Sequence, residues 1–122
     1  MKYLGLVWAG IYVEDLEASI SFYQNALGLP LLDQGDEWAH FDSGAGTLLE
    51  LFTGGTSTAE PKKPHQQSIV LGLRVEELDR VVAELEEKGV HFDPDESGEF
   101  EGTRWSHFSD PEGNRLEVKE IA

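Results

Sequence analysis

Two His–Glu pairs in this chain have the residue types and spacing to do chemistry. His107 and Glu117 flank residues 110–114, where proline presets the second position of a type I turn and Gly113 takes the left-handed position. If the ends of this loop pair with each other, His107 lies opposite Glu117 on one face of a hairpin, with Cβ atoms roughly 5 Å apart. His40 and Glu50 flank a second hairpin loop in the same way. The spacing therefore predicts two equivalent cross-strand pairs.

Two interpretations of these pairs remain open. The pairs could converge as a 2-His-2-carboxylate metal site, or each could be a simple cross-strand hydrogen bond. Arg115 and Lys119 share a strand face with Glu117, which is typical of a solvated strip. Apolar residues share the face of Glu50, which is typical of a cavity wall. These apolar residues are Leu48 and Phe52.

Aromatic residues accompany the two pairs. Trp38 and Trp105 each stand two residues before a histidine, so they lie on the same face as that histidine. Trp8 and Tyr12 alternate on one face of an expected first strand. Together these side chains could line a pocket for a planar or apolar ligand, or they could fill the core or a dimer interface.

The matching positions arise from an internal repeat. Residues 11–16 (IYVEDL) resemble residues 73–78 (LRVEEL), and residues 38–51 align with residues 105–118 with six identities in fourteen positions. Each copy predicts a strand, a helix ended by Gly28 or Gly89, and three short strands. We expect module one at about 5–53, a linker at about 54–67 and module two at about 68–121. The acidic run from 93 to 101 is expected to be a mobile loop.

Composition excludes several classes of function. The chain has 122 residues, no cysteine, and 24 acidic against 9 basic side chains, for a net charge of −15. Disulfides and thiolate metal sites are therefore excluded, no nucleic-acid partner is expected, and a cationic ligand is favoured over a glutathione conjugate. No apolar run is long enough for a membrane helix and no signal peptide is recognised, so we expect a cytoplasmic protein.

The duplication, the first-copy segment IYVEDLEASISFYQNALGL and the closing FSDPEGNRLEV resemble the vicinal oxygen chelate superfamily. This group holds glyoxalases, bleomycin-resistance proteins and extradiol dioxygenases. The resemblance covers nearly the whole chain and implies an α+β fold. It predicts two tandem βαβββ modules forming a curved, mostly antiparallel eight-stranded sheet with helices outside.

The resemblance also assigns four metal-ligand positions. The two last-strand positions fall on Glu50 and Glu117, which match the family's carboxylate ligands. The two first-strand positions fall on Trp8 and Val70, where neither side chain can ligate a divalent ion. Half of the expected ligand set is therefore missing.

These observations support three hypotheses. The first is a metal-independent binding protein, without cofactor and in a homodimer, that takes an aromatic or hydrophobic small molecule. Its expected ligand-binding residues are Trp8, Tyr12, Trp38, His40, Glu50, Trp105, His107 and Glu117. The second is a glyoxalase-like lyase, epimerase or isomerase, or a dioxygenase-type enzyme, with a divalent ion on Glu50 and Glu117. The third is a scaffold whose cavity is filled by its own tryptophans.

Overall fold

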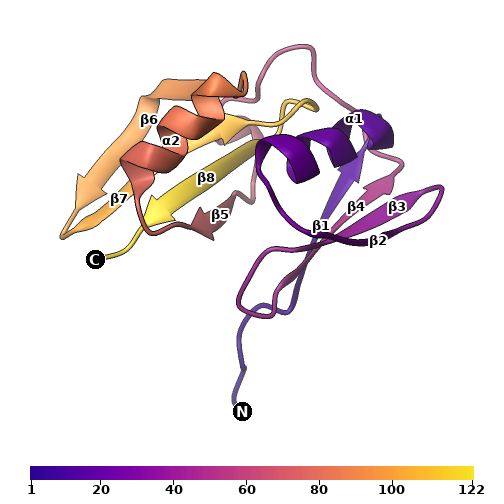
Figure 1. The fold of residues 1–122 in the computed structure, drawn as a ribbon, viewed down its shortest axis with the longest axis horizontal. Helices are drawn as coiled ribbons and strands as arrows, with labels where there is room; N and C mark the ends of the chain where they lie inside the picture. Colours follow the sequence, from indigo (N-terminus) through magenta and orange to yellow (C-terminus); the bar gives the residue numbers. More distant parts are fainter. The chain divides into compact units, whose positions relative to one another are not determined.

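The structure is a computed structural model that describes residues 1–122, and the chain divides into two compact units. Module one is the unit Met1–Ser57, and module two is the unit Thr58–Ala122. Each has the order strand, helix and three strands, so the predicted tandem βαβββ architecture and the α+β class are confirmed (Figure 1). The eight strands form two four-stranded sheets, one in each module.

Module one is a mixed sheet with strand order β1-β4-β3-β2. Strand β1 runs parallel to β4, and the other neighbours are antiparallel. Its first helix packs against β4 and continues into one π-helical turn. The elements are β1 (Trp8–Val13), α1 (Leu16–Ser21), the π turn η1 (Phe22–Ala26), β2 (Leu31–Gln34), β3 (Trp38–Asp42) and β4 (Leu48–Thr53).

Alternation along the strands separates the two faces of this sheet. Ala39, Phe41 and Leu51 are fully buried, as is Tyr23 from the π turn, so these residues form the core on the helix side. The Asp15 carboxylate caps α1 by accepting a hydrogen bond from the Ala18 backbone N–H at 3.1 Å. The residues between the core positions, which include both members of the His–Glu pair, project from the other face.

Module two repeats the arrangement with strand order β5-β8-β7-β6. Its core joins Leu78 and Leu85 of the helix to Phe108, Leu116 and Val118 of the sheet, all at most 6% exposed. The elements are a short 3-10 turn η2 (Pro64–Gln66), β5 (Leu71–Arg74), α2 (Leu78–Glu87), β6 (Phe92–Phe100), β7 (Thr103–Ser109) and β8 (Arg115–Glu120). No helix of the chain is long and apolar enough to cross a membrane.

The expectation of a mobile acidic loop at 93–101 is wrong, because residues 93–100 belong to strand β6, which pairs with β7, and Glu101 lies in the turn between the two strands. The two strands are joined by a tight turn in which Glu101 and Gly102 have φ values of 51° and 83°. Positive φ at both central residues is the geometry that suits a two-residue hairpin. The acidic composition of this segment indicated a loop. β6 is the outermost strand of its sheet, where acidic side chains can remain solvated.

The second half of the expected linker is bound to module two. The backbone N–H groups of Thr58 and Lys62 donate to the carbonyls of Glu112 and Gly113, at 3.0 and 2.9 Å. The Gln67 side chain bonds both the N–H and the C=O of Arg115 at 2.8 Å. Residues 58–67 therefore lie along the start of β8 and cover its first residue.

Candidate functional site

His40 and Glu50 are directly opposite each other on β3 and β4, so the predicted pairing is confirmed. His40 Nε2 lies 3.2 Å from Glu50 Oε2, and both side chains are about one-quarter exposed. The other ring nitrogen, Nδ1, lies 2.8 Å from the carboxylate of Asp33 on β2. Sequence reasoning missed Asp33, because an irregularity in the β2–β3 register hides its position from strand counting.

Trp8 supplies the second partner of Glu50. Its indole Nε1–H donates to Glu50 Oε1 at 2.9 Å, so both carboxylate oxygens of Glu50 are engaged by side chains of module one. Gly10, the parallel-strand neighbour of Glu50, makes this bond possible. The Trp8 ring lies over Gly10, in space that any side chain there would occupy.

An aromatic cluster extends from this bond across the open face of module one. Trp8 and Phe52 stack with centroids 6.2 Å apart, and Tyr12 meets the Phe52 ring edge-on at 4.0 Å. Trp8 and Tyr12 remain 49% and 64% exposed. The Trp38 and His40 rings lie against each other with centroids 4.6 Å apart and planes tilted by 36°. We call Trp8, Tyr12, Trp38, His40, Glu50 and Phe52 the aromatic face.

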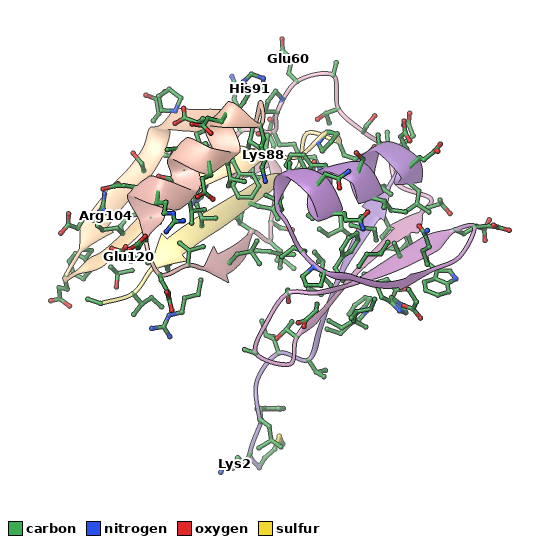
Figure 2. The ribbon with its side chains drawn as sticks, viewed as in Figure 1. Lys2, Glu60, Lys88, His91, Arg104 and Glu120 are labelled. Carbon is green, nitrogen blue, oxygen red and sulfur yellow. The ribbon has the colours of Figure 1, made fainter.

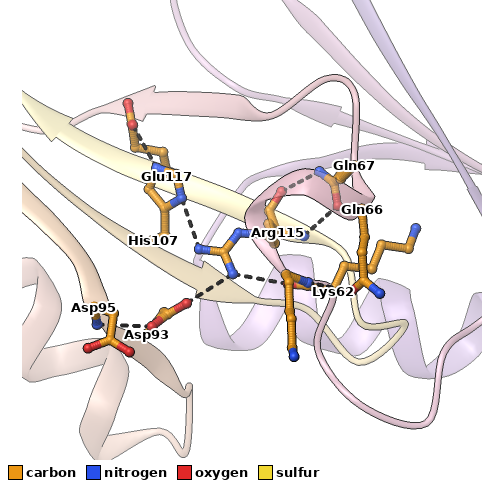
Figure 3. A network of polar contacts seen from close by, with 9 residues as sticks. Lys62, Gln66, Gln67, Asp93, Asp95, His107, Arg115 and Glu117 are labelled. Carbon is orange, nitrogen blue, oxygen red and sulfur yellow. Dashed lines mark hydrogen bonds and ion pairs between the residues drawn. The ribbon is translucent and has the colours of Figure 1, made fainter.

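The equivalent pair of module two has the same register but different surroundings. His107 lies opposite Glu117, with Nε2 and Oε2 2.9 Å apart. On the other side of the ring, the Arg115 guanidinium donates to His107 Nδ1 at 3.2 Å (Figure 3). The expected solvated strip is wrong at Arg115, which is only 3% exposed because residues 58–67 cover it.

Charged contacts complete the environment of Glu117. Lys119 Nζ lies 3.1 Å from Glu117 Oε1 and 5.8 Å from the centroid of the Trp105 ring. Arg115 also bonds Asp93 at 3.0 Å. The pKa of Asp93 is lowered, first by the backbone N–H of Asp95 and then by the Arg115 side chain. Module two therefore presents ion pairs where module one presents aromatic rings.

The donors present do not fit a divalent ion within either module. No group of three or more His, Asp or Glu side chains among residues 1–122 has the arrangement of a metal site. Both oxygens of Glu50 and of Glu117 have partners within their own module, and Trp8 and Val70 offer no ligand atom. The convergence of the two His–Glu pairs on one ion stays a prediction.

Comparison with known proteins identifies the family of this chain. Residues 5–118 match the Glyoxalase/Bleomycin resistance protein/Dioxygenase superfamily. The chain belongs to this superfamily. Uncharacterized protein YraH of Bacillus subtilis (strain 168) is 34% identical over 119 residues, which cover 88% of this chain and 91% of YraH.

Solved structures of other proteins share the fold. TnmS3, an antibiotic binding protein from Streptomyces sp. CB03234, is 27% identical with a TM-score of 0.75, covering 100% of this chain and 99% of its own. The fosfomycin resistance protein FosX from Listeria monocytogenes is 22% identical with a TM-score of 0.77, covering 99% and 94%. Members of similar fold thus include a protein that binds an antibiotic and a protein that confers resistance to one.

Proposed function

We propose that this superfamily member is a metal-independent binding protein that holds an aromatic or hydrophobic small molecule on the aromatic face of module one. The observation that carries the proposal is the hydrogen bond from Trp8 to Glu50. It places a half-exposed indole at a position that the superfamily resemblance assigns to a metal ligand, and it engages one oxygen of the carboxylate at another such position. The result is a surface for stacking rather than for coordination.

The shape of the aromatic face supports this function. Trp8, Phe52 and Tyr12 are held in fixed mutual orientations by ring contacts, yet Trp8 and Tyr12 keep large exposed areas. Exposed aromatic rings that are already oriented can bind a planar molecule with little loss of side-chain entropy. The antibiotic-binding relative TnmS3, 27% identical, supports a binding role for this chain.

The electrostatics of the aromatic face favour a ligand with a positive charge. Asp33 and Glu50 lie beside the rings, and the whole chain carries a net charge of −15. A cation placed over an indole ring is attracted by the ring as well as by nearby carboxylates. A homodimer belongs to the same proposal.

Isothermal titration calorimetry with two planar probes tests the function. The chain should bind the cationic 9-aminoacridine more tightly than the anionic anthracene-9-carboxylate. Trp8→Ala should weaken that binding at least about tenfold, because it removes the largest stacking surface. Phe100→Ala, which removes an exposed aromatic ring from module two, is the matched control and should leave binding unchanged.

Metal analysis distinguishes the competing enzyme hypothesis. Protein purified without chelator should contain no stoichiometric zinc, nickel or manganese, and added ions should leave the affinity for 9-aminoacridine unchanged. Stoichiometric metal that is lost in Glu50→Ala would contradict the proposal and support a glyoxalase-like lyase or epimerase. Sedimentation equilibrium checks the homodimer separately.

A further inference from the structure

A groove of about 470 Å³ lies between α2 and the outer strands β6 and β7 of module two. It is on the helix side of the sheet, where Phe108 and Leu116 are buried, whereas His107 and Glu117 project from the opposite side. Figure 1 shows α2 lying across these strands. The groove is therefore separate from the aromatic face of module one and from the His107–Glu117 pair.

The groove has apolar side chains on its helix side and small side chains on its strand side. Leu78, Val82 and Ala83 face it from successive turns of α2. Ser97 and Ser106, cross-strand neighbours on β6 and β7, form the floor, and their short side chains leave the space beneath the helix open. The volume lies in the range of pockets that hold small organic molecules.

The rim of the groove carries an excess of negative charge. Its three carboxylates are Asp79, Glu86 and Glu99, and its one cationic group is Arg104. Arg104 Nη2–H donates to Asp79 Oδ1 at 2.6 Å, which neutralises that pair (Figure 2 labels Arg104). Glu99 lies opposite Arg104 in the β6–β7 register, and the pKa of Arg104 is raised first by Asp79 and to a lesser degree by the charge of Glu99. Glu86 takes part in no ion pair among residues 1–122.

We propose that this groove binds a small organic amine, whose ammonium lies between Glu86 and Glu99 and whose compact apolar body packs on Val82 and Ala83. The occupant follows from charge complementarity. Three carboxylates against one guanidinium border an apolar strip, and a cleft bordered by an excess of one sign of charge concentrates the opposite charge. An anion of the same size is repelled by the same excess of carboxylates and by the net charge of −15.

An NMR titration with 2-phenylethylamine tests the site. The amine should shift the backbone amide signals of Ala83, Ser97 and Ser106 in a saturable way. The anion 3-phenylpropionate, of similar size, should leave them in place. Glu86→Gln combined with Glu99→Gln should weaken amine binding at least about fivefold, and added salt should weaken it in the wild type, because both carboxylates are exposed.

Two further variants sharpen the test. Ala83→Leu should abolish binding by filling the groove, and Glu84→Gln is the matched control, since Glu84 lies on the same helix but pairs with Arg80 outside the groove. Equal shifts with the anion, or unchanged affinity in the Glu86/Glu99 double variant, would overturn the site even if Ala83→Leu fails to fold. Trp8→Ala should not change the affinity for 2-phenylethylamine, although it should weaken binding of 9-aminoacridine. The groove and the proposed function of the aromatic face can therefore fail independently.

Discussion

The indole of Trp8 donates a hydrogen bond to Glu50 across the β1–β4 strand pair, with Nε1 and Oε1 2.9 Å apart. The superfamily resemblance assigns metal-ligand positions to both residues. In this chain the residue at one of those positions is instead the donor that engages the neighbouring carboxylate. This hydrogen bond gives Glu50 Oε1 a donor, and it holds the Trp8 ring in its place on the aromatic face.

Placing an imidazole at position 8 should strengthen metal binding to module one. In a Trp8→His variant, an imidazole stands on β1 next to the β4 strand that carries Glu50, and Glu50 loses its indole partner. We expect the affinity for Ni²⁺ or Zn²⁺ to rise by a factor on the order of ten or more relative to wild type. Calorimetry measures the change, and Trp8→Phe is the control that removes the indole without adding a ligand. Equal affinity in the two variants would contradict this account of the site.

Gly10→Ala should destabilise the chain through Trp8. A methyl group at position 10 would overlap the Trp8 ring, so the expected loss in free energy of unfolding is about 1–3 kcal/mol. In a Trp8→Ala background the same substitution should cost less, because the closer of the two overlapping rings is gone and only Phe52 Cε1, at 2.9 Å from the added methyl, remains. Urea denaturation of the four proteins measures this coupling. Gly72→Ala is the matched control, since its nearest contact is the flexible end of Glu117, at 3.1 Å.

The cross-strand pairs could be predicted from sequence because hairpin loops fix register. The Asp110 N–H donates to the Asn114 carbonyl at 2.9 Å, so the ends of that loop pair as the turn residues indicate. Once the ends are paired, strand alternation alone places His107 opposite Glu117. The duplicated order of elements follows from the same local signals.

The surroundings of the pairs could not be predicted, because they depend on rotamers and on distant segments. The Trp8–Glu50 bond depends on the indole turning over Gly10, which strand alternation does not specify. Arg115 looks solvated beside Lys119, yet the carbonyl of Lys62, 53 positions away in the chain, accepts its Nη1–H. No sequence pattern near Arg115 indicates a contact with a residue so far along the chain.

The Arg115–His107 hydrogen bond should fix one tautomer of the imidazole. A guanidinium can only donate, so His107 Nδ1 must accept, and the ring proton lies on Nε2, where it donates to Glu117 Oε2 at 2.9 Å. Long-range ¹H–¹⁵N correlation spectra should therefore show Nδ1 unprotonated and Nε2 protonated. Arg115→Met alone should keep this tautomer, because the Glu117 carboxylate still accepts from Nε2–H, whereas Arg115→Met combined with Glu117→Leu should populate both tautomers. Protonated Nδ1 in a neutral wild-type ring would contradict the assignment.

The lowered pKa of Asp93 should make part of the stability dependent on pH. A carboxyl whose pKa is lower in the folded than in the unfolded chain stabilises the fold above its unfolded pKa of about 3.9, and this contribution is lost as the pH falls through the folded value. The free energy of unfolding should therefore fall between about pH 5 and pH 2.5 more steeply in the wild type than in Asp93→Asn. Urea titrations at several pH values measure the difference. Asp36→Asn, an exposed carboxylate outside any ion pair, should keep the wild-type slope, and a wild-type slope in Asp93→Asn would contradict the role of Arg115 and the Asp95 N–H.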